Sequence, residues 1–463
     1  MVVDTGAIED ILVATKGPSA AQVDRILSRA SMLRGLSLED SAALLSIEEP
    51  RLLRRLYEKA GEIKRELFGR RIVLFAPLYL SNYCTNNCLY CGFRKDNRSA
   101  KRRLLTVEEA VAEACHLEGM GFHRILLVSG EDPKISTLDH LIAVIDGIYR
   151  NTGIRIVHVN AAPMGVEELR RLKGAGTGVY QVFQETYHRL TYLYMHPSGK
   201  KRGYDYRLEV MDRAMEAGFD DVGIGALLGL YDYRFDCLAT IAHSRHLYKR
   251  YGTHAHTVSV PRLRPAEGAG LVMPPVEVTD EDFKKIVAVY RLALPSVGIV
   301  VSTRESREVR DAVMGIGTSQ MSAGSRTDPG GYTHDIAEGH APEGREETVE
   351  QFSTSDHRTV AEVMGSILDG GFITSVCTSC YRVGRTGKEF TARTMRGDMG
   401  RFCNANAILT LQEFLLDHGE NGIRERGERA IERALQGIRE PSFKGEVMKR
   451  LDEIKGGRRD VFF

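Results

Sequence analysis

The sequence predicts an α/β protein built around a (βα)8 barrel of the TIM type, and three observations support this expectation. Between residues 71 and 322, eight short apolar runs alternate with segments whose apolar residues recur at helical spacing. Helical crossovers follow these runs, which is typical of the parallel strands of a barrel. The chain has 463 residues, 43% of them hydrophobic and 27% charged, which is enough apolar material for a large core. A doubly wound open sheet is the alternative, because pattern alone does not prove closure.

The predicted strands and helices follow one another in order from residue 72. The first run, residues 72–80, is continuously apolar, as expected for a strand buried on both faces. The next helix begins after Thr106, which forms a capping-box pattern with Glu109. The other predicted strands cover residues 124–128, 154–160, 179–185, 221–227, 256–260, 298–302 and 318–322. The other predicted helices cover residues 138–150, 166–173, 207–217, 233–251, a segment capped by Thr279 and Asp282, and 308–313.

Segments on both sides of the barrel give three predicted domains. Residues 1–70 have helical patterns and are expected to form an N-terminal helical extension. The barrel domain is expected to span 71–354, where residues 325–350 are rich in Gly, Pro, His and Glu and look like a long surface connection. Residues 355–463 are expected to form a small helical C-terminal domain. Its predicted helices cover residues 360–368 and two segments between 405 and 437.

Composition excludes several classes of function. Lys and Arg number 63 and Asp and Glu 62, so the net charge of +1 gives no reason to expect nucleic acid as a partner. No membrane association is expected either, because the longest apolar runs have about half the length needed to cross a bilayer. The N-terminus carries acidic residues and no basic-then-apolar run, so no secretory signal is expected and the cytoplasm is the expected location.

The eight cysteines are too few for a disulfide framework. Six of them form two groups of three, and such groups in a reducing cytosol are usually metal or catalytic sites. Cys115 and Cys237 stand alone within helical patterns. We expect both to be small buried hydrophobic residues.

The first cysteine group has the spacing C-x3-C-x2-C at Cys84, Cys88 and Cys91, directly after the first predicted strand. The loops after barrel strands form the active-site face. Three thiolates can hold three irons of a [4Fe–4S] cluster. The open fourth iron can then chelate S-adenosylmethionine (SAM) and pass an electron to its sulfonium, which yields a 5′-deoxyadenosyl radical. Zinc is the alternative, but zinc requires a fourth ligand, and the nearest histidine, His116, lies within the next predicted helix.

The second cysteine group has the spacing C-x2-C-x22-C at Cys377, Cys380 and Cys403. Cationic residues follow its second cysteine and would partly neutralise an anionic cluster. Three thiolates without an obvious fourth ligand favour a second iron–sulfur cluster. A zinc site completed by His357 or His418 is the alternative.

With an aromatic residue, Tyr90, before its third cysteine, the first group resembles the cluster motif of the radical SAM enzymes. Ser129-Gly130-Glu131 ends the second predicted strand, where that superfamily has a Gly-Gly-Glu-like motif whose backbone meets the methionine amino group; here Ser129 replaces the first glycine. For Glu185 and Arg207, the alternative role is a surface salt bridge. The SAM contacts that the resemblance implies are Tyr90, Ser129, Gly130, Glu131, Glu185 and Arg207.

The second group resembles that of the HydG-type tyrosine lyases, which mature [FeFe]-hydrogenase. The related thiazole-pathway tyrosine lyases (ThiH) share the barrel motifs but lack the second cluster, so Cys377, Cys380 and Cys403 discriminate between the two. The resemblance begins near residue 70 and covers nearly all of the remaining chain. It includes residues 72–84, 130–133, 184–187, 256–262, 302–305 and 322–326.

The resemblance implies that tyrosine is cleaved between Cα and Cβ, after the adenosyl radical removes a hydrogen from its amino group, to give p-cresol and dehydroglycine. It also implies that dehydroglycine becomes CO and cyanide at an auxiliary [4Fe–4S] cluster linked to a fifth iron. The output is an Fe(CO)2(CN) unit carried on cysteine. The implied partners are tyrosine, free cysteine as an iron ligand, an electron donor such as ferredoxin or flavodoxin, and hydrogenase-maturation proteins. The alternatives are a thiazole-type lyase that stops at dehydroglycine and a non-catalytic iron–sulfur or zinc scaffold protein.

Three further site residues come from the resemblance. Arg304, at the end of the seventh predicted strand, matches the arginine that pairs with the tyrosine carboxylate, a suitable partner for a guanidinium. Ser322 ends the eighth strand and can donate a hydrogen bond to the same carboxylate. A salt bridge to Glu305 or Glu308 is the alternative role for Arg304. His256, at the start of the sixth strand, matches the histidine that binds the fifth iron, with His254 as the rival ligand. The barrel is expected to connect the two cluster sites.

Overall fold

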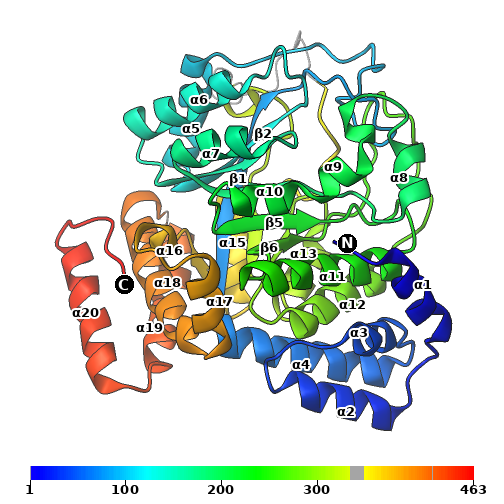
Figure 1. Cartoon of the computed structure of the whole chain (residues 1–463). Coiled ribbons are helices and arrows are strands. Elements are labelled where there is room, and N and C mark those ends of the chain that lie inside the picture. The colour runs from blue at the N-terminus through cyan, green and yellow to red at the C-terminus, as the bar shows by residue number, and fades with distance from the viewer. Residues whose placement is uncertain (1, 334–348, 420) are drawn as a thin grey trace.

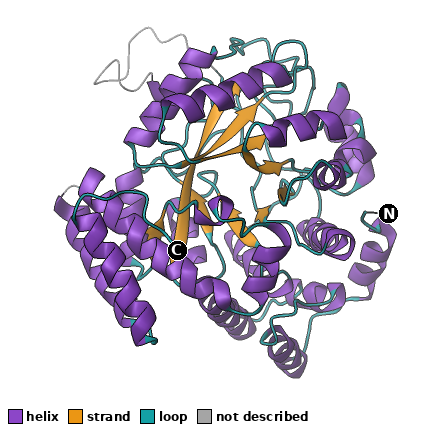
Figure 2. Cartoon of the chain, turned by 60° about the vertical axis from the view of Figure 1, so that its left-hand side comes forward, coloured by secondary structure: helices purple, strands orange, loops and turns teal. Residues whose placement is uncertain are grey.

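A computed structural model describes residues 2–333, 349–419 and 421–463 of the chain. Eight parallel strands form a closed barrel, because β1 pairs with β2 on one side and with β8 on the other. Helices surround the strands (Figures 1 and 2), so the predicted (βα)8 fold is confirmed and the open sheet is excluded. The barrel strands are β1 (Arg71–Ser81), β2 (Arg124–Ser129), β3 (Ile156–Asn160), β4 (Thr177–Gln181), β5 (Asp221–Gly225), β6 (Thr257–Ser259), β7 (Gly298–Val301) and β8 (Gln320–Ser322).

The helices between the strands begin where the sequence provides caps. Thr106 and Glu109 form the predicted capping box of α5, and Thr279 and Asp282 form that of α12. Such caps satisfy backbone N–H groups that have no partner within the helix. The crossover helices are α5 (Val107–Gly119), α6 (Leu138–Asn151), α7 (Val166–Gly174), α8 (Arg189–Met195), α9 (Tyr204–Leu208), α10 (Val210–Glu216), α11 (Tyr233–Tyr251), α12 (Asp280–Ala293) and α13 (Arg307–Met314).

The crossover between β4 and β5 differs from the prediction. The fourth strand ends at Gln181, four residues before its predicted end, although Glu185, which has a left-handed φ of 71°, still forms a single parallel bridge with Ala226. Helix α8 follows and was not predicted. It buries Tyr192 and Met195, but its apolar residues Leu190 and Tyr194 are 73% and 68% exposed, so apolar residues on both faces hide the helical period in the sequence.

The N-terminal extension is helical, and in the view of Figure 1 α2, α3 and α4 lie below the barrel while α1 lies at its right-hand side. Its longest helix, α4, packs on α12, and α3 packs on α11 and α12. Helix α4 then leads directly into β1, so the extension is joined to the N-terminal end of the first strand. These helices are α1 (Thr5–Ala14), α2 (Ala20–Ala30), α3 (Leu38–Leu45) and α4 (Pro50–Phe68).

The C-terminal segment is joined to the same end of the barrel. A short strand, β9 (Ile373–Ser375), pairs in parallel with Arg71–Val73, the part of β1 that precedes its pairing with β2. The following helices stack beside it (Figure 1), and α18 packs on α4, β9 and β1. The division of the chain at residues 70 and 354 stays a prediction. The C-terminal helices are α15 (Val360–Asp369), α16 (Ser379–Arg382), α17 (Gly387–Met395), α18 (Asp398–His418), α19 (Asn421–Gln436) and α20 (Pro441–Lys455).

The remaining expectations concern the two solitary cysteines, the predicted surface connection and membrane-spanning helices. Cys237 is buried as predicted, but Cys115 is exposed, so that prediction was wrong. Helix α5 buries Glu113, which accepts hydrogen bonds from the Tyr332 and Thr333 backbone N–H groups, and this turns Cys115 outward. Of the predicted surface connection, residues 334–348 lie outside the described residues. None of the helices in the described part of the chain is long and apolar enough to cross a membrane.

Candidate active site and second cysteine site

The first cysteine group lies in the loop directly after β1, at the C-terminal end of the barrel strands. Cys84, Cys88 and Cys91 line a cavity of about 200 Å³ inside the barrel. All three are free, and burial raises the pKa of each thiol, that of Cys91 to about 12. Within the described ranges, no three His, Cys, Asp or Glu side chains are grouped so as to hold a single metal ion. Three thiols in one loop fit a [4Fe–4S] cluster, which binds its cysteines at separate corners.

Neighbouring segments fix the cysteine loop through backbone hydrogen bonds. The Leu89 N–H donates to the Met195 carbonyl at the end of α8 (3.0 Å), and the Leu271 N–H donates to the Leu89 carbonyl (2.8 Å). The Thr85 N–H donates to the Glu131 carbonyl after β2 (3.1 Å). The three sulfur atoms are therefore held before any cluster binds, which lowers the ordering cost of cluster assembly.

Charged residues predicted to contact SAM form one buried network beside the cysteines. The Arg207 guanidinium lies 2.9 Å from a Glu131 carboxylate oxygen and 3.7 Å from Glu185. Lys201, which the sequence did not indicate, lies 2.6 Å from Glu185. Burial raises the pKa of both carboxyls, but Arg207 and Lys201 outweigh it and hold each pKa below its ordinary value. Surface salt bridges are thus excluded as the role of Glu185 and Arg207.

The segment after β2 approaches the cysteine loop closely. A Cβ atom at Gly130 would lie 2.2 Å from the Tyr83 carbonyl oxygen, so only glycine fits there. The Gly130 N–H donates to the Ser81 carbonyl (2.8 Å), and the Ser129 hydroxyl donates to the Gly130 carbonyl (3.1 Å). Tyr90, by contrast, is fixed by a 2.8 Å contact between its hydroxyl and His196.

Arg304, in the turn after β7, and Ser322, the last residue of β8, line the same cavity. The Ser322 hydroxyl accepts a hydrogen bond from the Thr303 N–H (3.3 Å) and keeps its own proton to donate. Burial lowers the pKa of the Arg304 guanidinium to about 10. Glu305, one of its two alternative partners, instead pairs with Arg262. No carboxylate among the described residues, Glu308 included, forms an ion pair with Arg304, whose side chain lines the cavity.

The second cysteine group lies at the opposite, N-terminal end of the barrel. Cys377 follows β9, Cys380 lies on α16 and Cys403 is buried on α18, and the three line a second cavity of about 50 Å³. Arg71, the first residue of β1, faces their sulfur atoms. Burial lowers the pKa of the Arg71 guanidinium, but the cysteines, Cys403 foremost, outweigh it and raise this pKa. Sequence reasoning missed Arg71, because a charged residue before an apolar run carries no signal of what it will face.

His256 precedes β6 at this same end, which explains its place at the start of a strand. Its Nε2 lies 3.1 Å from the Tyr381 hydroxyl, and its Nδ1 lies 3.2 Å from an Asp221 carboxylate oxygen. His256 lines both cavities. The rival residue His254 stacks on Tyr248 and contacts the Ser244 carbonyl through Nδ1 (3.2 Å), away from the cysteines. The geometry therefore favours His256.

The two cavities share part of their walls. Arg124, His256 and Gln320 line both of them, and all three side chains are largely buried. The Arg124 guanidinium contacts His158 (2.8 Å). The two cavities are therefore neighbours inside the barrel, and the connection between the two cysteine sites stays a prediction.

Known proteins resemble the chain over most of its length. The family model described as the Radical SAM superfamily matches residues 78–242, and that of the Biotin and Thiamin Synthesis associated domain matches residues 259–373. The chain is 36% identical to a 2-iminoacetate synthase of Salmonella typhimurium over 77% of this chain and 91% of that protein. It is 35% identical to a 2-iminoacetate synthase of Escherichia coli over 78% and 92%.

Two solved structures extend the similarity to the C-terminal segment. One is the crystal structure of HydG, a maturase of the [FeFe]-hydrogenase, with a TM-score of 0.94 and 43% identity over 100% of both chains. The other is the FeFe-hydrogenase maturase HydG from Carboxydothermus hydrogenoformans. Its TM-score is 0.84 and its identity 37%, over 96% of this chain and 97% of that chain.

Proposed function

The chain belongs to the family of radical SAM enzymes that contains the HydG maturases and the 2-iminoacetate synthases, and we propose that it is a tyrosine lyase that also makes CO and cyanide. Tyrosine would be cleaved to p-cresol and dehydroglycine (2-iminoacetate). The second step would convert dehydroglycine to CO and cyanide for an Fe(CO)2(CN) unit. The observation that carries this proposal is the group of Cys377, Cys380 and Cys403 around a second cavity at the other end of the barrel.

The cofactors follow from the two cysteine groups. When bound, a [4Fe–4S] cluster at the first group supplies the electron that turns SAM into a 5′-deoxyadenosyl radical, and a second cluster supplies iron for the CO- and cyanide-forming step. Around the first cluster, Glu131 and Glu185 offer ionised carboxylates to the hydroxyl and ammonium groups of SAM. Arg207 and Lys201 keep those carboxylates ionised. The Gly130 backbone lies beside the cysteine loop, where a methionine amino group would bind.

Arg304 and Ser322 form the proposed site for the tyrosine carboxylate. The Arg304 guanidinium, which has no carboxylate partner among the described residues, offers two parallel N–H groups to the substrate carboxylate, and the Ser322 hydroxyl adds a further donor. Both residues line the cavity that also contains the first cysteine group. Binding the carboxylate there would keep the tyrosine amino group within the same enclosed space as SAM and away from bulk water.

Arg304→Ala should weaken tyrosine binding and leave slow SAM cleavage in place. Losing a hydrogen-bonded charge partner costs roughly 1.5–3 kcal/mol, or about 10- to 150-fold in affinity. The dependence of p-cresol formation on tyrosine concentration measures this loss. Arg304→Lys keeps the charge without the planar fork and should lie between the parent and the alanine variant. An unchanged apparent tyrosine affinity in Arg304→Ala would show that another residue holds the carboxylate.

The second site would hold its cluster through three thiolates and a fifth iron through His256. The Asp221 carboxylate lies beside Nδ1 of His256, an arrangement that orients a ligating imidazole. Nε2, which contacts the Tyr381 hydroxyl, would bind the metal in place of that contact. Arg71 offsets the negative charge of three thiolates. Free cysteine would complete the ligands of the fifth iron. The proposed partners are an electron donor such as ferredoxin or flavodoxin and the hydrogenase-maturation proteins that receive the product.

A thiazole-type lyase that stops at dehydroglycine is the second candidate, because the chain covers 91% of a 2-iminoacetate synthase at 36% identity. The distinguishing experiment supplies anaerobically reconstituted protein with tyrosine, SAM and a reductant. We expect p-cresol together with CO, which deoxyhaemoglobin traps. Formation of p-cresol without CO would favour the thiazole-type reaction. Stoichiometric zinc without p-cresol would instead favour a scaffold protein.

A further inference from the structure

A segment that follows the barrel strands in sequence lies across the C-terminal end of the barrel. We call residues 349–358 the strap. Its backbone is hydrogen-bonded to three loops: the Gly92 N–H donates to the Gln351 carbonyl (3.0 Å), the Ser353 N–H to the Pro265 carbonyl (2.9 Å) and the Ser355 N–H to the Thr303 carbonyl (2.8 Å). The strap is therefore fixed to the cysteine loop and to the end of β7 at the same time.

The contact with the cysteine loop is close. Gly92 directly follows Cys91, and a Cβ atom there would lie 2.1 Å from the Glu350 carbonyl oxygen. The strap backbone can pack on the loop only because residue 92 is glycine. On the cavity side, the Tyr79 hydroxyl donates to the Gln351 side chain (2.7 Å). The strap thus forms part of the cavity wall.

Phe352 is the strap residue that touches the proposed carboxylate site. The Arg304 guanidinium carbon lies 3.2 Å from the centroid of the Phe352 ring, and both side chains line the cavity. A guanidinium that stacks on an aromatic ring has its plane fixed, while its N–H groups remain free at the edge. No carboxylate among the described residues pairs with Arg304, so this ring is what orients it.

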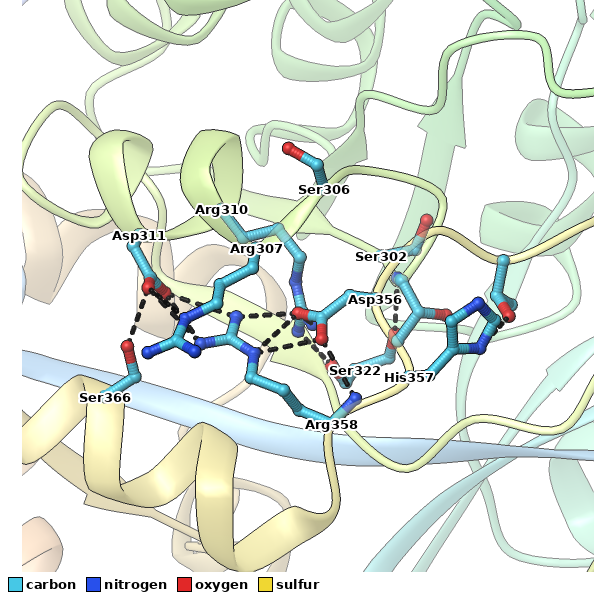
Figure 3. A network of polar contacts seen from close by, with 12 residues as sticks. Ser302, Ser306, Arg307, Arg310, Asp311, Ser322, Asp356, His357, Arg358 and Ser366 are labelled. Carbon is cyan, nitrogen blue, oxygen red and sulfur yellow. Dashed lines mark hydrogen bonds and ion pairs between the residues drawn. The ribbon is translucent and has the colours of Figure 1, made fainter.

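Asp356 anchors the strap through a buried network (Figure 3). Its carboxylate lies between the guanidinium groups of Arg310 and Arg358, 2.6 Å from the latter, and Arg310 also donates to the Ser322 carbonyl. Burial raises the pKa of the Asp356 carboxyl, but its two arginine partners outweigh this and hold the pKa below its ordinary value.

The network continues to the helices outside the barrel. Arg358 lies 3.2 Å from Asp311 on α13, and the Ser366 hydroxyl on α15 donates to Asp311 (2.7 Å). The anchor therefore fixes the strap, the end of β8 and two outer helices to one another (Figure 3).

We propose that Phe352 is a positioning residue for substrate, which holds the Arg304 guanidinium in the orientation that receives the tyrosine carboxylate, and that the Asp356 anchor keeps the ring in place. The inference rests on the proposed function, since it assumes an amino-acid carboxylate at Arg304. It makes the strap a contributor to substrate specificity, because a substrate without a carboxylate would not bind the guanidinium that Phe352 orients.

Phe352→Leu tests the proposal, because it keeps an apolar side chain and removes the ring. We expect tyrosine binding, measured by calorimetry on the reconstituted, SAM-bound protein, to weaken about 2- to 30-fold, as expected for a lost cation–π contact. The KM for tyrosine should rise by the same factor, with kcat at saturating tyrosine and iron content unchanged. Phe352→Tyr keeps the ring and should restore both values.

Two further variants separate positioning from a general structural role. In an Arg304→Ala background, Phe352→Leu should cause no additional loss, because the ring acts through Arg304. Phe443→Leu removes a comparable arginine–ring contact, with Arg401 at 4.0 Å, in the C-terminal segment and should leave tyrosine binding unchanged. Asp356→Asn weakens the anchor and should also raise the KM for tyrosine.

Parent-like tyrosine binding in Phe352→Leu, or an equal loss in the Arg304→Ala background, would overturn the proposal. Its failure is distinguishable from failure of the proposed function. A parent protein that binds tyrosine but releases no p-cresol contradicts the lyase reaction, and calorimetry still tests the role of Phe352.

Discussion

Replacing Cys84, Cys88 or Cys91 by alanine should abolish both SAM cleavage and p-cresol formation. Each thiolate would hold one iron, and the loop is fixed by backbone hydrogen bonds on several sides, so no other cysteine can move into the vacated corner. Without the first cluster no radical forms, and every later step depends on the radical. Chromatographic measurement of 5′-deoxyadenosine and p-cresol in the three variants tests this expectation.

Cys115→Ala is the matched control, because Cys115 is an exposed, solitary cysteine on α5. It should retain parent rates of SAM cleavage and p-cresol formation. If any one of the three loop variants still cleaved SAM at the parent rate, that cysteine would not be a cluster ligand and the assignment of the active site would fail.

Replacing both Cys377 and Cys380 by alanine should separate the two proposed reactions. The two cysteine groups lie at opposite ends of the barrel, so the first cluster and the tyrosine site remain intact. We expect p-cresol to persist, at the parent rate or more slowly, and CO to disappear because no auxiliary iron remains. Cyanide is a weaker marker, since dehydroglycine can break down by other routes.

Two outcomes would contradict this division between the sites. CO formation at the parent rate in the Cys377→Ala/Cys380→Ala protein would show that the second group is not needed for it. Complete loss of p-cresol, with the electron paramagnetic resonance signal of the first cluster preserved, would place the C-terminal site within the radical step.

The features that the sequence predicted correctly are local or periodic. Barrel strands such as 72–80 are continuously apolar because both faces are buried, and helix starts such as Thr106 carry their own caps. The first cysteine group was recognisable because Cys84, Cys88 and Cys91 lie in one loop. That the three cysteines are ligands of one cluster stays a prediction.

The features that the sequence did not reveal depend on tertiary contacts. Strand β9 has only three residues, too few for a periodic signal, yet it places Cys377 beside the barrel. Arg71 and Phe352 belong to no sequence motif, because the residues that they contact in the fold, Cys403 and Arg304, are distant in sequence. Cys115 is the opposite case. The helix that contains it was predicted correctly, but that helix buries Glu113 and leaves Cys115 on the surface.

The iron content per chain tests most directly whether one chain holds two separate clusters. After anaerobic reconstitution, the parent should contain about eight to nine irons per chain, and the Cys377→Ala/Cys380→Ala protein about four. Sulfide should fall by about half in parallel. About four irons in the parent, or the same iron content in both proteins, would contradict the claim that Cys377, Cys380 and Cys403 hold a cluster.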